Sequence, residues 1–240
     1  MTSSPHPAPD VCNPWSRLSF AAWLCVAIHL VAGIAMATIL RSGLETNPDL
    51  TGRLWFLAYQ QSVWVAAWLT WNASALAILY FYLSFSWAHR MDVKTPAAPL
   101  RMAVMLTTAA VAADLSAEAI HMVVLPDLAR GILDDMTKDT AGASIQLFQS
   151  INRVAVMLTG FLANGLYTIS ALLLICPTRN AYPRWTWIAG LLVGVGGIGL
   201  SVAALINSVA GMVWSNVVLV PAIVVWQVGV AVTAGRRGRE

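Results

Sequence analysis

Long apolar stretches dominate the chain, and six of them are long enough to cross a lipid bilayer. They cover residues 18–40, 56–86, 102–125, 151–175, 185–207 and 212–234. A transmembrane helix needs about 20 consecutive, mostly apolar residues. The stretches lack the two-residue alternation that is typical of membrane β-strands. The pattern therefore predicts an all-α fold, an integral membrane bundle of six transmembrane helices.

Composition supports a membrane protein and argues against two other classes. Hydrophobic residues make up 58% of the chain and charged residues only 10%, whereas an ordinary soluble domain has about 25% charged residues. The net charge of +3 is small, and the basic residues are scattered between the apolar stretches. Nucleic-acid binding needs a basic patch. We therefore expect membrane lipids as partners and no nucleic acid.

The domain organisation follows from these stretches. Residues 1–16 are rich in proline and serine at their start and are expected to form a disordered tail. Residues 17–235 form the six-helix domain, and residues 236–240 form a basic C-terminal tail. The first stretch is expected to stay in the protein, because no positive charge precedes Arg17 and the apolar run is longer than in a signal peptide.

The orientation is predicted from the positions of lysine and arginine. Nine of these residues flank the spans on the side of the two termini, and five lie on the other side. The positive-inside rule then places both termini in the cytoplasm. The longest connection, residues 126–144, lies on the opposite side. Pro126 is expected to end the third span, and residues 127–136 to form a short amphipathic turn on the membrane surface.

The third span contains a polar column within the apolar stretch AADLSAEAIHMVVLP. Asp114, Glu118 and His121 stand at positions i, i+4 and i+7, so they share one face of a helix. Each such group costs about 2.5–3.5 kcal/mol at the membrane centre. Counted from Pro126, His121 lies about 7 Å deep, Glu118 about 12 Å and Asp114 about 18 Å. Intramembrane ionisable residues usually mark a pathway or a site.

We expect this column to line a polar pocket between the first, third and fourth spans. Arg153 enters the fourth span at the level of Glu118 and is expected to pair with it. The predicted ligand or proton pathway consists of Asp114, Glu118, His121, Arg153, His29 and Asn164. The alternative is that these groups only hold helices together, at about 0.6 kcal/mol per contact. For His29, packing is at least as good an explanation.

The chemistry of the column leaves three functional hypotheses open. The first is a small-molecule or proton-linked binding, transport or sensing module. The second is a membrane-embedded metal or cofactor enzyme, since Glu118-x-x-His121 has the spacing of di-iron sites. The third is a regulatory or scaffold subunit. Because only one such pair is present, we expect no metal and no cofactor, and the sequence indicates no catalytic residues.

Two further patterns concern aromatic and small residues. Trp64, Trp68 and Trp71 recur at i, i+4 and i+7 in the second span and could form an aromatic wall for a ligand, or simply pack. In the fifth span small residues share one face, namely Gly190, Gly194, Gly197 and Ser201. Such faces allow close helix contact. This face could pack within the bundle, or contact a second copy or another membrane partner.

Three stretches belong together in a comparison, namely the Glu118/His121 region, residues 182–197 (YPRWTWIAGLLVGVGG) and residues 216–232 (NVVLVPAIVVWQVGVAV). They resemble a family of six-span bacterial membrane proteins whose domain has no known function. The family has Glu-x-x-x-His in the third span, which is one residue longer than the spacing here. The resemblance covers roughly the C-terminal half. It implies a multi-pass protein of the bacterial inner (plasma) membrane and a six-helix bundle, but no activity.

Overall fold

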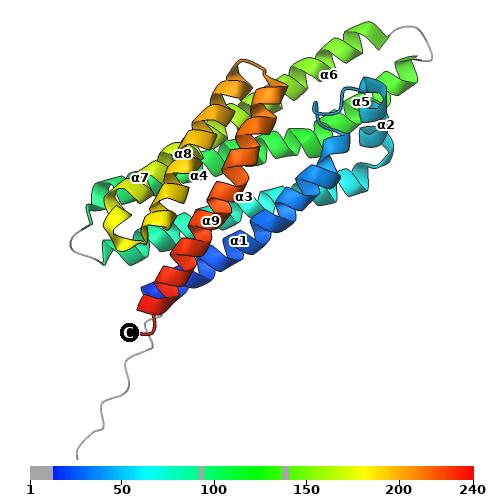
Figure 1. Cartoon of the computed structure of the whole chain (residues 1–240). Helices are drawn as coiled ribbons and strands as arrows, with labels where there is room; N and C mark the ends of the chain where they lie inside the picture. Colours follow the sequence, from blue (N-terminus) through cyan, green and yellow to red (C-terminus); the bar gives the residue numbers. More distant parts are fainter. Residues whose placement is uncertain (1–12, 92–94, 137–140) are drawn as a thin grey trace, which may run out of the picture.

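The computed structural model describes residues 13–91, 95–136 and 141–240, and every regular element in these ranges is helical. Six helices are apolar and long enough to cross a membrane, which confirms the predicted number of spans. They are Pro14–Ser42, Gln61–Arg90, Ala97–Asp135, Gly142–Ala181, Arg184–Leu205 and Val209–Arg237. The helices run side by side along the length of an elongated bundle (Figure 1).

Helices α1 (Pro14–Thr38), α3 (Gln61–Arg90), α8 (Arg184–Leu205) and α9 (Val209–Arg237) are single rods. The other two spans are built from two α-helices each. Helix α4 (Ala97–Ala119) continues through a π-helical segment, Ile120–Val124, into α5 (Leu125–Met136). Helix α6 (Ala141–Val156) continues through a second π-helical segment, Met157–Ala163, into α7 (Asn164–Thr178).

These two composite rods are longer than a membrane is thick. They hold 39 and 40 residues, or about 60 Å each at 1.5 Å per residue, against a hydrocarbon core of about 30 Å. The α5 and α6 ends therefore project beyond the other spans (Figure 1). The prediction that Pro126 ends the third span is wrong. The helix passes through this proline just after a π-helical turn, where the regular hydrogen-bond pattern has already changed.

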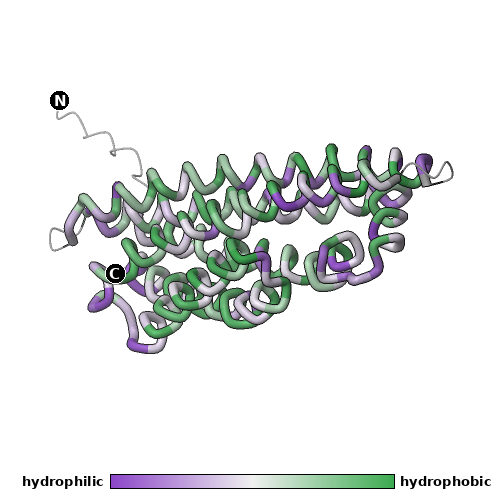
Figure 2. Tube along the Cα trace, turned by 90° about the horizontal axis from the view of Figure 1, so that it is seen from above, coloured by the Kyte–Doolittle hydropathy of each residue, from purple (hydrophilic) through white to green (hydrophobic). Residues whose placement is uncertain are grey.

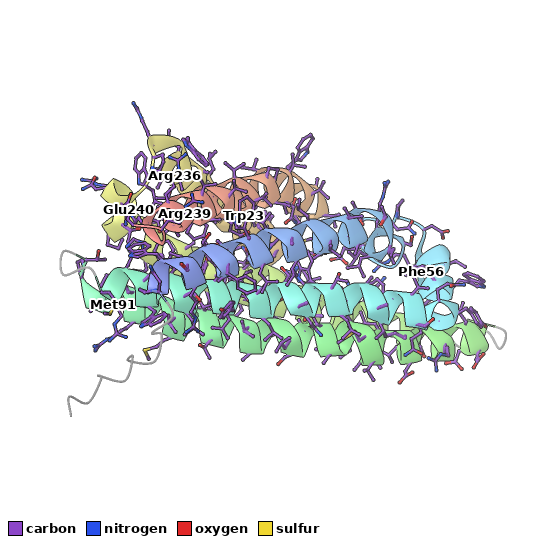
Figure 3. The ribbon with its side chains drawn as sticks, turned by 90° about the horizontal axis from the view of Figure 1, so that it is seen from below. Trp23, Phe56, Met91, Arg236, Arg239 and Glu240 are labelled. Atoms are coloured by element: carbon purple, nitrogen blue, oxygen red, sulfur yellow. The ribbon has the colours of Figure 1, made fainter. Side chains whose placement is uncertain are left out.

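A short segment between α1 and α3 packs beside the projecting part. It contains a 3-10 turn, Leu40–Ser42, and helix α2 (Leu50–Tyr59), and α2 contacts α5. We call residues 40–59 the cap segment and this end of the bundle the cap end. Phe56 lies at this end, whereas Met91, Arg236, Arg239 and Glu240 lie at the opposite, termini end (Figure 3). The predicted amphipathic segment is helical, but it continues α4 instead of lying across it.

Two buried clusters stabilise the bundle. One fills the half toward the termini end and includes Phe81, Tyr82, Phe85 and Trp226. The second lies at the cap end and includes Leu54, Leu57, Trp64, Trp68 and Phe148. Helix α1 packs on α3 and α9, α4 packs on α3 and α7, and α8 packs on α7 and α9. The cap segment thus completes the second core.

The outside of the bundle is itself apolar. Hydrophobic residues follow the helices along their length, and hydrophilic ones are more frequent toward the two ends (Figure 2). Large apolar side chains are exposed on several spans, among them Phe20, Ile34, Leu69, Val195 and Ile198. An apolar surface of this extent is expected where a protein contacts lipid. Together with the six apolar helices it is compatible with a multi-pass membrane protein.

The small-residue face of α8 packs inside the chain. Side chains added at Gly190, Gly194 and Gly197 would collide with residues of α7. At Gly194, for example, a Cβ atom would lie 2.7 Å from Leu172 Cδ2. Ser201 on the same face accepts a hydrogen bond from α7 as well. Of the stated alternatives, the structure therefore shows packing within the bundle, with α7 against this face.

Candidate functional site

The polar column of α4 points into the bundle. Only 5% of Asp114, 0% of Glu118 and 1% of His121 is exposed. Asp114 and Glu118 lie one turn apart on α4, and His121 lies in the π-helical segment that follows. The 3.6-residue period that suggested a shared face therefore brings the three side chains together in the interior.

Asp114 is held by two hydroxyl groups from the neighbouring rod. Thr159 Oγ1 donates a hydrogen bond of 2.5 Å to Asp114 Oδ1, and the Tyr167 hydroxyl donates one of 3.4 Å to Oδ2. An O–H···O distance of about 2.5–2.7 Å is typical of a donor to an ionised carboxylate. The two hydroxyl donors therefore favour the ionised form of Asp114. Sequence reasoning missed both donors, because a lone threonine or tyrosine in an apolar span carries no signal of its own.

Glu118 has a different environment. It is fully buried, and neither carboxyl oxygen has a hydrogen-bond partner among the described residues. Asp114 is near enough to interact with it electrostatically. A buried carboxylate without a donor or a counter-ion is costly, and two neighbouring carboxylates oppose each other's ionisation. These surroundings favour the protonated form of Glu118 over the ionised form.

Tryptophans of α3 surround His121. The Trp68 ring stacks on the imidazole with centroids 4.3 Å apart and an interplanar angle of 11°. Trp64 Nε1 donates a 2.6 Å hydrogen bond to the backbone carbonyl of His121. Trp71 is partly buried and packs against the same cap-end cluster. The aromatic face of the second span therefore lies against the polar column, with Trp64 and Trp68 in direct contact.

Both π-helical segments of the described chain adjoin the column. His121 belongs to the first, and Thr159, which binds Asp114, belongs to the second. A π-helical turn changes the backbone hydrogen-bond pattern and is frequent at functional sites. The indole of Trp64 supplies a donor to one carbonyl of the first segment. Two adjacent irregular turns in antiparallel rods thus frame the buried acids.

Arg153 does not pair with Glu118, so this expectation is wrong. Its guanidinium donates to the carbonyl oxygens of Ala204 and Leu205 and to Asn207 Oδ1, each over 2.7 Å. The final carbonyl groups of a helix have no partner within it and attract a cation. Arg153 therefore binds the C-terminal end of α8, where these carbonyls are available at the edge of the bundle.

Asn164 and His29 also lie away from the column. Asn164 Nδ2 donates to the Gly197 carbonyl (2.7 Å) and to Ser201 Oγ (2.9 Å) on α8. His29 Nδ1 lies 2.8 Å from the Cys25 carbonyl, and His29 Nε2 lies 3.2 Å from the Ser74 hydroxyl. Among the described residues α1 packs on α3 and α9, whereas α4 packs on α3 and α7, so the neighbours of the column are the second and fourth spans instead of the expected first and fourth.

The hydrogen bond from Arg153 to the end of α8 shows how far inside the bundle the polar column lies. Arg153 lies at the end of α8, and Thr159, which binds Asp114, comes six residues later in the rod. At 1.5 Å per residue Asp114 therefore lies about 9 Å inside the end of α8. The count from Pro126 had placed it about 18 Å deep, but Pro126 is part of the projecting rod. The column therefore lies nearer to the cap-side end of α8 than to its other end.

Arg53 of α2 is a charged group on the cap side of the column. It is near enough to His121 to interact with it electrostatically. Its Nε donates to the Gly43 carbonyl over 3.3 Å, and its Nη2 lies 4.0 Å from Glu45 Oε2. Burial lowers the pKa of the Arg53 guanidinium, and the Glu45 carboxylate raises it again in part. Sequence reasoning missed Arg53 because it lies in a connection between spans.

A separate groove of about 520 Å³ opens between α1 and α3. Its walls include Val31, Ile34, Ser62, Ala66 and Thr70. The residues of the polar column are not part of its lining. The groove is mostly apolar and open, as expected of a surface that contacts lipid.

Within the described ranges, no group of three or more histidine, cysteine, aspartate or glutamate side chains is arranged to hold a metal ion. The chain matches no known protein family model, no curated protein and no solved structure. The resemblance to a six-span bacterial family therefore stays a prediction.

Proposed function

We propose that this multi-pass membrane protein takes up and releases a proton at the Asp114–Glu118 pair, as part of binding, transporting or sensing a small molecule. The observation that carries the proposal is the fully buried Glu118 carboxyl, whose two oxygens have no hydrogen-bond partner in the described part of the chain. Asp114, one turn away, accepts two hydrogen bonds. The two acids therefore differ in how easily each one holds a proton.

The surroundings support a proton-exchanging role. Thr159 and Tyr167 stabilise the charge on Asp114, so the shared proton is left to Glu118. His121 and Arg53 lie on the cap side of the pair. A histidine next to a buried acid is a common element of proton pathways in membranes.

The orientation belongs to the same proposal. With both termini in the cytoplasm, the cap end faces the other side of the bacterial inner membrane. The supporting observation is the set of arginines at the termini end, including Arg236 and Arg239 (Figure 3). Arg237 in the same tail donates to the Ala181 carbonyl over 2.8 Å and lies 4.6 Å from the centroid of the Trp15 ring. Such a basic end suits the cytoplasmic side.

The test is pH-difference infrared spectroscopy of the purified protein. Wild-type protein should show a protonated-carboxyl band that disappears as the pH rises. Glu118→Gln should lose this band. Asp127→Asn should keep it, because Asp127 is exposed and paired only with Arg130 among the charged residues described. If Glu118→Gln retains the full band, the proposal is wrong. Proton flux in liposomes then separates transport from sensing.

The two other hypotheses receive less support. A metal enzyme would need ligands beyond Glu118 and His121, and the described residues do not group three of them. A scaffold role would account for Asn164 and Arg153, which join α7 and α6 to α8. It gives no reason for burying Glu118 without a donor, which costs free energy and joins no helices.

A further inference from the structure

Buried polar atoms without a hydrogen-bond partner gather where α3 meets α4. Among the described residues they are Glu118 Oε1 and Oε2, His121 Nδ1, Trp68 Nε1 and Asn72 Oδ1. Most buried polar groups in proteins are hydrogen-bonded, and exceptions often indicate a bound water or ion. Several exceptions in one place therefore call for a common explanation.

The geometry brings these atoms to two adjacent levels. Trp68 stacks directly on His121. Helices α3 and α4 are antiparallel neighbours. One turn after Trp68 on α3 comes Asn72, and one turn before His121 on the facing rod comes Glu118. The amide of Asn72 and the carboxyl of Glu118 therefore lie at the same level on facing helices.

Acceptors outnumber donors in this group. When Glu118 is ionised, its carboxylate and the Asn72 carbonyl offer three acceptor oxygens, whereas Trp68 offers one donor and His121 Nδ1 can serve in either role. A ligand that satisfies this set must donate hydrogen bonds or carry positive charge. It must also be compact, because exposure is at most 2% for Glu118, His121 and Trp68.

The charges around the group also favour a cation. Asp114 is one turn from Glu118 and adds a second carboxylate. On the cap side Arg53 faces His121, and Glu45 lies 4.0 Å from Arg53. Thr159 and Tyr167, which pack against the column from the neighbouring rod, are uncharged donors to Asp114. Once Glu118 is ionised, two carboxylates therefore lie at the group, and Glu45 balances the charge of Arg53 on its cap side.

We propose that Glu118 and Asn72 bind a compact monovalent cation of the sodium or ammonium type, which displaces the proton of Glu118. In this exchange the O–H bond of the Glu118 carboxyl breaks, the proton leaves to solvent, and the carboxylate and the Asn72 amide oxygen contact the cation. The proposal rests on the proposed function, because it takes Glu118 as the exchanging acid. It adds the class of ligand for which the proton is exchanged.

The first test is thermal unfolding, followed by tryptophan fluorescence, in sodium, ammonium, potassium or choline chloride at equal ionic strength. At about ten times the dissociation constant, a bound cation should raise the midpoint by about 3–5 °C relative to choline. Glu118→Gln should abolish this shift, and Asn72→Leu should at least halve it. Asn216→Leu is the matched control, because Asn216 bonds to the Met212 carbonyl of its own helix α9.

The second test needs no variant. Addition of sodium chloride to weakly buffered wild-type protein should release protons, whereas choline chloride should not. Equal midpoints in all four salts, without proton release, would overturn the cation site. If Glu118 still shows its protonated-carboxyl band in that case, the proposed proton exchange stands and only the cation is excluded. If the band is also absent, both proposals fail.

Discussion

Replacement of Thr159 by valine would remove one donor from Asp114 and leave nearly the same shape. The hydroxyl lies 2.5 Å from Asp114 Oδ1, whereas the remaining donor, Tyr167, is 3.4 Å from Oδ2. The longer contact is too weak to compensate for the loss of the shorter one. We therefore expect Thr159→Val to destabilise the folded protein without a large change in packing.

The size of the effect depends on the charge of Asp114. A hydrogen bond to a charged group contributes about 1.5–3 kcal/mol. A neutral hydrogen bond between membrane helices contributes about 0.6 kcal/mol on average. Because the short distance indicates an ionised acceptor, we expect Thr159→Val to lower the free energy of unfolding by about 2 kcal/mol.

The assay is reversible unfolding in mixed detergent micelles at neutral pH. Thr108→Val is the matched control, because Thr108 is exposed on α4 and donates only to the Val104 carbonyl of its own helix, over 3.0 Å. It should change stability by less than about 0.5 kcal/mol. Two results would contradict an ionised Asp114. In the first, Thr159→Val lowers the free energy of unfolding no more than Thr108→Val does. In the second, Thr159→Val lowers it less than Tyr167→Phe does.

Three further changes test other contacts by the same unfolding assay. Arg153→Leu should cost about 3 kcal/mol, because three hydrogen bonds from a charged group to the end of α8 are lost; a neutral result would show that these bonds contribute nothing. Gly43→Val should lower the free energy of unfolding by about 1–3 kcal/mol, because a Cβ atom at this position would lie 2.7 Å from the Trp64 ring. Gly131→Ala is the control and should not destabilise the protein, because its Cβ atom would meet no described atom within 4 Å. Trp64→Phe should cost about 1 kcal/mol through loss of the bond to the His121 carbonyl, and equal stability would argue that this bond does not hold the π-helical turn.

The sequence predicts those features that depend on local pattern. The length and hydropathy of the apolar stretches are enough to find six helices, because every span must satisfy its own backbone hydrogen bonds in lipid. The 3.6-residue period is enough to place Asp114, Glu118 and His121 on one buried face. It also places Trp64 and Trp68 together, although only the structure shows that they contact His121.

The features that sequence reasoning missed depend on contacts between distant segments. Arg153 binds the free carbonyls at the end of α8 and not the buried Glu118. Pro126 is a helix breaker in isolation, yet here the helix continues through it after a π-helical turn. A depth counted from Pro126 therefore starts from a residue that is not the end of the helix.

Asp114 and Glu118 differ in their surroundings more than in their chemistry. Both are carboxylic acids on one face of α4, and no rule of sequence distinguishes them. The neighbouring rod presents Thr159 and Tyr167 to Asp114 alone. Two acids whose environments separate their affinities for a proton can hold one proton and one charge at the same time. Such a pair can exchange its proton without burying two charges, and this makes Glu118, rather than Asp114, the residue whose replacement should abolish exchange.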